Sequence, residues 1–216
     1  MKTRLYLLRL DFLRDSEVYE KMRGQVSLSR RLRADKYRLA DDRIRSLGAG
    51  LLLEYATGHT DDECELGPNG KPYFPAYPDL QFSLSHSGML AVCAVSDRVL
   101  GVDCQEIVCG KESFRLIAKR YFTEEEQEKV FRRSPHSEEA EDAFDPAAFS
   151  EVWTKREAYV KMTGEGLAAL LEYGKEPCFF PGVPEIEDYC VNICLRGEEE
   201  AEAEIREVFP DELERK

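Results

Sequence analysis

Two stretches of this chain have the pattern of a buried helix that ends at Thr-Gly and is followed by strands. The first, residues 46–56, is apolar nearly all round and ends at Thr57-Gly58; the second, residues 147–163, ends at Thr163-Gly164. A glycine directly after a helix is a common stop signal, because it adopts left-handed backbone without strain. Since this helix-then-strand order occurs twice, the sequence predicts an α+β protein of two similar halves, a pseudo-duplication, packed side by side.

Strand-like alternation fills most of the remainder, together with a helical stretch at 112–133. The apolar start reads as a first strand, and His86-Ser87-Gly88 is predicted to be the turn between two later strands. We place the boundary between the halves after residue 104, which gives an N-terminal half of 1–104 and a C-terminal half of 105–216. The predicted strands are residues 5–8, 81–85, 89–95, 99–103 and 189–195.

The distribution of charge is more informative than its net value of −13, which argues against general nucleic-acid binding. A loop at 134–148 has five acidic residues and no Lys or Arg, and a tail at 198–216 has nine acidic residues against three basic ones. Both are predicted to be solvated. Residues 30–45 carry seven basic residues against three acidic ones. Taken alone, this basic segment is an anion site or merely a solvated helix.

Hydrophobic runs and cysteines limit the location of the protein. No apolar run reaches the roughly 20 residues that a membrane helix needs, and the apolar start is too short for a signal peptide. The seven cysteines contain no C-x-x-C pair and indicate neither a disulfide framework nor a zinc site. We therefore expect a cytoplasmic protein that binds no membrane.

Three groups of residues carry chemistry. Glu157 and Lys161 lie four residues apart on the second helix and therefore share a face, which alone is ordinary for a solvated helix. Asp103 ends an apolar strand, and water alone could satisfy it. Ser85 and His86 lie at a predicted turn, where a hydroxyl and an imidazole either shape the turn or bind a phosphate.

Taken together, these residues resemble the 4′-phosphopantetheinyl transferase family in its two-halved, Sfp-like form. The resemblance covers about residues 30–167. It implies transfer of the phosphopantetheine arm of coenzyme A to a serine of an apo acyl or peptidyl carrier protein, with release of adenosine 3′,5′-bisphosphate. The motifs that carry it are Gly70-Lys71-Pro72, Phe82 to Gly88, Leu100-Gly101-Val102-Asp103, and Trp153…Glu157…Lys161…Gly164-x-Gly166-Leu167.

The resemblance also implies the site. Asp103 and Glu157, brought together where the halves meet, would bind Mg²⁺, which prefers oxygen ligands. Glu157 is expected to be the general base, and Lys161 is expected to meet a phosphate oxygen as the second catalytic residue. The residues expected to contact coenzyme A are Arg30, Arg33, Arg45, Ser46, Lys71, Ser85, His86 and Lys161.

Two positions depart from the family pattern. Gln105 stands where members often have a second acid, so we expect a site of two carboxylates, with weaker affinity for Mg²⁺ or an altered metal preference. Arg156 replaces a lysine but keeps its charge.

The alternative function is that of a non-catalytic relative that binds coenzyme A or a carrier protein. A serine hydrolase is not indicated, because the chain has no G-x-S-x-G motif. A duplicated chain can build its cleft alone, so we expect a monomer.

Overall fold

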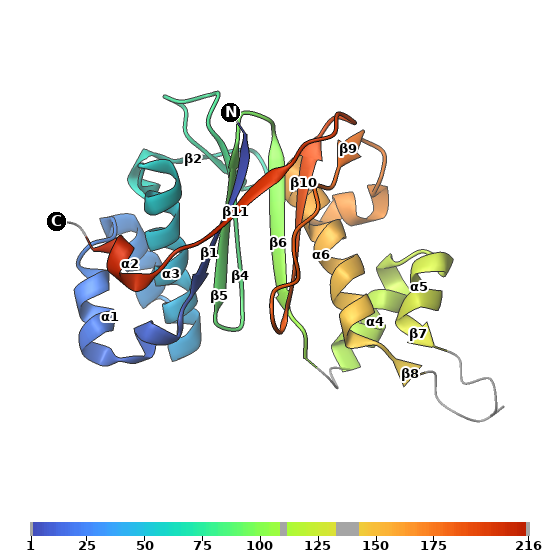
Figure 1. Cartoon of the computed structure of the whole chain (residues 1–216), viewed down its shortest axis with the longest axis horizontal. Coiled ribbons are helices and arrows are strands. Elements are labelled where there is room, and N and C mark those ends of the chain that lie inside the picture. Colours follow the sequence, from blue (N-terminus) through green and yellow to red (C-terminus); the bar gives the residue numbers. More distant parts are fainter. Residues whose placement is uncertain (1, 109–111, 133–142, 215–216) are drawn as a thin grey trace.

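The strands form two sheets that lie face to face between two groups of helices (Figure 1). This computed structural model describes residues 2–108, 112–132 and 143–214. The first sheet has the order β11-β1-β5-β4 and the second the order β6-β10-β9. The architecture is therefore mixed α+β, as predicted. The strands of the two sheets are β1 (Thr3–Arg9), β4 (Gln81–Ser87), β5 (Leu90–Ser96), β6 (Leu100–Glu106), β9 (Cys178–Phe179), β10 (Tyr189–Arg196) and β11 (Ala203–Glu207).

Apolar side chains from both sheets fill the space between them. Leu5 and Val92 from the first sheet belong to one buried cluster with Val102 and Ile193 from the second. Alternate residues on a strand point to opposite faces, so Asp103, next to Val102, points away from this cluster toward the helix on the other side. The alternation thus decides which residues of β6 reach the helix face.

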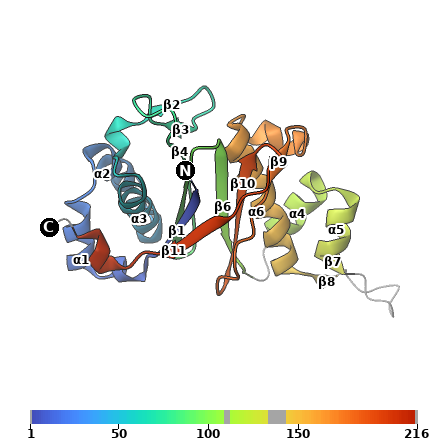
Figure 2. The same cartoon turned by 45° about the horizontal axis from the view of Figure 1, so that its top comes forward.

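Each sheet is covered on its outer face by one long helix. α3 (Ala40–Thr57) packs on the first sheet with α1 (Ser16–Arg23) and α2 (Leu28–Asp35) beside it, and α6 (Pro146–Thr163) packs on the second (Figures 1 and 2). α4 (Glu112–Tyr121) and α5 (Glu124–Val130) lie beyond α6. Among the described residues, no helix combines the length and apolar character needed to cross a membrane.

Helix signals in the sequence explain the ends of α3 and α6. Asp145 caps α6 by accepting hydrogen bonds from two backbone N–H groups, and proline follows at the first helical position. Gly58 and Gly164, with φ of 76° and 73°, end the two helices in left-handed backbone. Both predicted Thr-Gly stops are confirmed, although α3 begins earlier than predicted, at Ala40.

Short elements complete the chain. The two-stranded pairs are β2 (Glu65–Leu66) with β3 (Pro72–Tyr73) and β7 (Phe131–Arg132) with β8 (Ala143–Phe144). The 3-10 helices are η1 (Asp11–Arg14), η2 (Asp61–Glu63), η3 (Leu167–Glu172) and η4 (Pro210–Leu213).

Three predictions of local structure were wrong. β4 continues through Ser87 and the chain turns at Gly88-Met89, because His86 still pairs with Ala91 of β5. The helical stretch at 112–133 is two helices, because Thr123 caps a new one with Glu126 in a capping box. The acidic tail at 198–216 was predicted to be solvated, but part of it is a strand of the first sheet.

The tail contributes β11, which runs parallel to β1, and Val208 just after it is buried. Its alternating acidic residues leave one face exposed, which is why composition suggested a solvated segment. Most of the acidic loop predicted at 134–148 lies outside the described residues, as does Cys109.

Candidate active site

Six of the predicted site residues line one cavity of about 630 Å³. The cavity lies between α2 and η2 on one side and β4, β6 and α6 on the other. Segments that are far apart in the sequence therefore meet here. The six residues are Arg30, Arg33, Ser85, His86, Asp103 and Lys161.

Asp103 is the centre of a buried polar cluster. Lys161 Nζ on α6 donates to Asp103 Oδ1 at 2.7 Å, and Ser85 Oγ on β4 donates to the same oxygen at 2.7 Å. Lys161 Nζ also lies 2.9 Å from Ser85 Oγ. Asp103 is only 7% exposed, so this charge needs its partners to offset desolvation.

Glu157 lies one helical turn before Lys161, and its pKa is influenced by the charge of Asp103. Burial raises the pKa of Glu157, repulsion from Asp103 raises it further, and Lys161 opposes both. A buried and a partly buried carboxylate that repel each other are a set of oxygen ligands that a divalent cation would stabilise. The residues present therefore fit the Mg²⁺ that the family resemblance implies.

Gln105 does not add a third charge to this pair. Strand alternation puts it on the face of β6 that also carries Asp103, and its amide nitrogen donates to the Glu106 carbonyl at 3.0 Å. To a metal ion, Gln105 can therefore offer only its side-chain carbonyl oxygen, which is a neutral ligand. Within the described parts of the chain, no group of three or more His, Cys, Asp or Glu residues is arranged to bind a metal.

Gly101 lets α6 approach β6 closely enough to form the cluster. A Cβ at Gly101 would lie 2.0 Å from the Ala158 carbonyl oxygen and 2.4 Å from the Met162 nitrogen, both backbone atoms of α6. Any side chain here would force the helix away from the strand. The glycine of Leu100-Gly101-Val102-Asp103 thus sets the distance between Asp103 and Lys161.

His86 lines the cavity beside this cluster, and the charge of Arg45 on α3 acts on its imidazole. His86 is exposed on β4, and desolvation lowers its pKa, as do the positive charges of Lys161 and Arg45. Arg45 donates to the Gly88 carbonyl at 3.2 Å and forms an ion pair with Asp42. The imidazole, Lys161 and Arg45 therefore lie close to one another, an arrangement that suits an anionic ligand.

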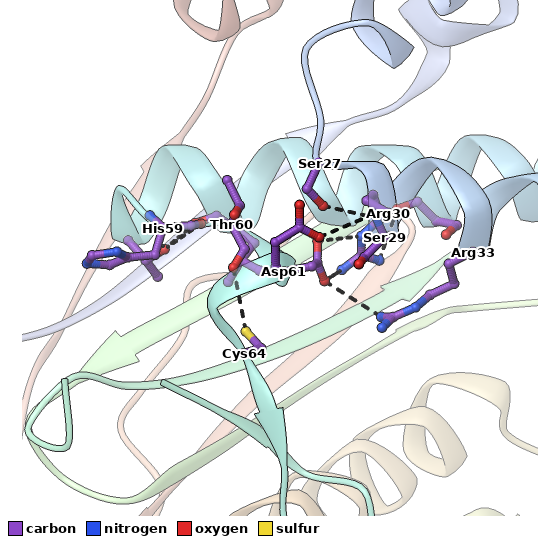
Figure 3. Close-up of polar contacts among 12 residues, drawn as sticks. Ser27, Ser29, Arg30, Arg33, His59, Thr60, Asp61 and Cys64 are labelled. Atoms are coloured by element: carbon purple, nitrogen blue, oxygen red, sulfur yellow. Dashed lines mark hydrogen bonds and ion pairs between the residues drawn. The ribbon is translucent and has the colours of Figure 1, made fainter. Parts of the chain in front are cut away.

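At the opposite wall, Asp61 holds two arginines (Figure 3). Arg30 is buried and Ser46 provides it with a backbone acceptor, while the Ser46 hydroxyl is buried without a hydrogen-bond partner among the described residues. Sequence reasoning did not identify Asp61. The signal was there: Asp61-Asp62-Glu63 follows the first Thr-Gly stop and is the nearest acidic run after the basic segment.

Five predicted site residues do not line this cavity: Arg45, Ser46, Lys71, Gln105 and Glu157. Lys71 is the one that turns to backbone carbonyls instead. Its amine donates to the Leu100 carbonyl at 2.9 Å and the Met162 carbonyl at 3.0 Å, and it lines adjoining cavities instead. Desolvation lowers its pKa to about 8. In this structure Lys71 links the strand β6 to the end of α6.

Comparisons with known proteins agree with the geometry. A family model described as the 4′-phosphopantetheinyl transferase superfamily matches residues 99–191, which include Asp103, Glu157 and Lys161. A 4′-phosphopantetheinyl transferase of Bacillus subtilis is 27% identical over 198 residues, covering 81% of this chain and 84% of the relative. The transferase psf-1 of Bacillus pumilus is 31% identical over 155 residues, covering 69% of this chain and 62% of the relative. The transferase HetI of a Nostoc species is 29% identical over 178 residues, covering 78% of this chain and 72% of the relative.

Proposed function

The chain belongs to the 4′-phosphopantetheinyl transferase superfamily, with Sfp-like relatives, and on that premise we propose the reaction and the roles of its residues. The protein is a transferase that moves the 4′-phosphopantetheine arm of coenzyme A to a serine of an apo carrier protein. The released product is adenosine 3′,5′-bisphosphate. The observation that supports the assignment is the Lys161–Asp103 contact on the wall of a cavity that has two arginines on its opposite wall, with Glu157 one helical turn before Lys161.

The reaction exchanges one phosphorus–oxygen bond for another. The serine oxygen of the carrier forms a bond to the phosphorus next to the pantetheine arm, and the bond from that phosphorus to the bridging pyrophosphate oxygen breaks. The electron pair of the broken bond leaves with adenosine 3′,5′-bisphosphate. Catalysis of such a transfer consists mainly of positioning and of stabilising charge.

Glu157 accepts the serine proton in this proposal. A carboxylate in a partly dry position binds a proton more readily than one in water, and the raised pKa of Glu157 suits a general base. Asp103 and Glu157 would hold the Mg²⁺, with the Gln105 carbonyl oxygen as a neutral neighbour. When bound, that ion would offset the charge of the pyrophosphate and polarise it.

The remaining predicted residues would bind the substrate. Ser85, His86 and Lys161 are placed beside Asp103, where they would contact the pyrophosphate. Arg30 and Arg33 lie on the opposite wall, which suits the 3′-phosphate of coenzyme A. Arg45 and Ser46 on α3 would border the nucleotide. Lys71 would reach a phosphate only by giving up its two carbonyl partners.

The two-halved organisation, residues 1–104 and 105–216 with the site between them, remains part of this proposal. Its support is the parallel between α3 and α6, which are 18 residues each, each cover one sheet and each end at a left-handed glycine. The proposed boundary falls within β6, and β11 returns to the first sheet, so the halves share strands. Because a single chain forms the whole cavity, the protein is expected to act as a monomer. We also expect it in the cytoplasm.

The test is a mass measurement. The purified protein is incubated with coenzyme A, Mg²⁺ and several apo carrier proteins, and the intact mass of each carrier is followed. We expect at least one carrier to gain the mass of phosphopantetheine. If coenzyme A binds but no carrier is modified, the protein is instead a non-catalytic relative, which the absence of an acid at position 105 would explain.

A further inference from the structure

One carboxylate organises the wall of the cavity that faces the catalytic cluster. Asp61 on η2 is nearly buried, with 9% of its side chain exposed, and it contacts both arginines that α2 turns toward it (Figure 3). Arg30 Nε and Nη2 donate to its two oxygens at 2.9 and 2.6 Å, a bidentate pair. Arg33 Nη1 lies 3.7 Å from the same carboxylate, which is an ion pair but too long for a hydrogen bond.

The two arginines differ in what they can offer to a ligand. Arg30 has 6% of its side chain exposed and uses three of its N–H donors, because Nη1 also donates to the Ser46 carbonyl at 3.2 Å. Arg33 has half of its side chain exposed, and its guanidinium keeps a fork of donors that matches a phosphate. Both arginines line the cavity, but Arg33 is the one able to turn its donors into it.

The position of Arg30 is built into α3. A Cβ at Gly50 would lie 2.5 Å from Arg30 Cγ and 2.8 Å from its Nε, so the stem of Arg30 occupies the space that the missing side chain leaves. Asp61 then fixes the far end of the same side chain. Arg30 is therefore part of the wall, whereas the family resemblance suggested a direct phosphate contact.

We propose that Asp61 is a positioning residue for recognition of the 3′-phosphate of coenzyme A. It fixes Arg30 in the cavity wall and orients Arg33, which binds this phosphate. The inference rests on the proposed function. With Asp61 ionised, the three side chains carry a net charge of +1, so the wall still attracts a phosphate. Selectivity for the 3′-phosphate then depends on Arg33 and on the carboxylate that orients it.

Direct binding tests this without a carrier protein. The affinities of the full chain for adenosine 3′,5′-bisphosphate and adenosine 5′-monophosphate are measured by calorimetry, and their ratio is the selectivity for the 3′-phosphate. We expect Arg33→Gln to lower the ratio by about tenfold, as for the loss of one charge-assisted hydrogen bond. Asp61→Asn is expected to lower it by a similar factor, and the double variant Asp61→Asn with Arg33→Gln by little more than either alone.

The sign of the Asp61→Asn effect is decisive. Removing a negative charge should strengthen phosphate binding if Asp61 only neutralises the arginines, and weaken it if Asp61 positions them. The matched control is Asp79→Asn, the same change on an exposed residue outside the cavity lining, which is expected to leave the ratio unchanged. In the transfer assay, Asp61→Asn should raise the KM for coenzyme A, leave kcat within about twofold, and leave the KM for dephospho-coenzyme A unchanged.

Other outcomes separate the two proposals. If the wild type selects the 3′-phosphate and Asp61→Asn keeps or increases that selectivity, the role of Asp61 is overturned and the proposed function stands. If the wild type shows no such selectivity, the role of Asp61 is overturned, and the carrier mass measurement still decides the proposed function. Should Asp61→Asn fail to fold, Asp61→Glu decides, because it keeps the charge and moves it outward by one methylene: reduced selectivity supports the inference and unchanged selectivity overturns it.

Discussion

Lys161 donates a hydrogen bond to Asp103 across 2.7 Å, although the first residue lies on α6 and the second on β6. The contact couples the helix that carries Glu157 to the strand that carries Asp103. It depends on a close approach of the two backbones at Gly101. The first two predictions concern this contact and its surroundings.

Gly101→Ala is expected to reduce both stability and transfer. The new Cβ would overlap backbone atoms of α6, which cannot rotate away as a side chain can, so the helix must shift; such overpacking costs about 1–3 kcal/mol or more. Urea denaturation and the rate of carrier modification measure the two effects. Gly182→Ala is the control, since no atom lies within 4 Å of the Cβ it would add. Wild-type activity in Gly101→Ala would show that the close approach is not needed.

Glu157→Gln is expected to lower the transfer rate by about a hundredfold or more, the usual effect of losing a general base. The free energy of unfolding should be unchanged or higher, because burial and Asp103 already disfavour the charge on Glu157. Mass spectrometry of the carrier measures the transfer rate, and urea denaturation measures the free energy of unfolding. Glu151→Gln makes the same change on an exposed part of α6 and should retain activity. Full turnover by Glu157→Gln would exclude the assigned role.

Arg156→Met tests the buried ion pair that anchors α5 to α6. Arg156 is 3% exposed, forms a bidentate pair with Glu126, donates to the Leu170 carbonyl and stacks against Tyr173. Removing one partner of a buried pair typically costs about 3–5 kcal/mol, because the other charge is left uncompensated. The matched control is Lys155→Met, which breaks an exposed pair with Glu151 and should cost less than about 0.5 kcal/mol. Equal costs for the two variants in urea denaturation would contradict the prediction.

Lys71 gives the protein a predicted dependence of stability on pH. Its pKa in the folded chain is lowered to about 8, below the ordinary value of 10.5, so the unfolded chain binds this proton more readily between those two values. Stability therefore rises with pH across that window. We expect the free energy of unfolding of the wild type, relative to Lys71→Met, to increase from pH 8 to pH 10 and to stay level below pH 7. A relative decrease above pH 8 would show that the two carbonyl contacts outweigh desolvation.

Local signals were enough to predict the long elements, whereas the residues proposed for the catalytic cluster came from the family resemblance. The Thr-Gly stops, the strand patterns and the spacing of Glu157 and Lys161 act over a few residues, so a single sequence contains them. The turn after β4 was misplaced because pairing with β5, not the polar character of His86-Ser87, decides where the strand ends. The tail was misread because its partner, β1, lies almost the whole chain away.

By itself the sequence determined the α+β class and the two helix stops, because these follow from backbone preferences within short segments; the residues proposed for the site came from motifs that resemble those of a known family. Only the tertiary structure decided that Asp61 faces Arg30 and Arg33, that Lys71 turns to two carbonyls and that β11 closes the first sheet. Each of these rests on a contact between segments distant in the chain. Such contacts depend on packing and on the desolvation of charge, and both are set only when the two sheets and their helices come together.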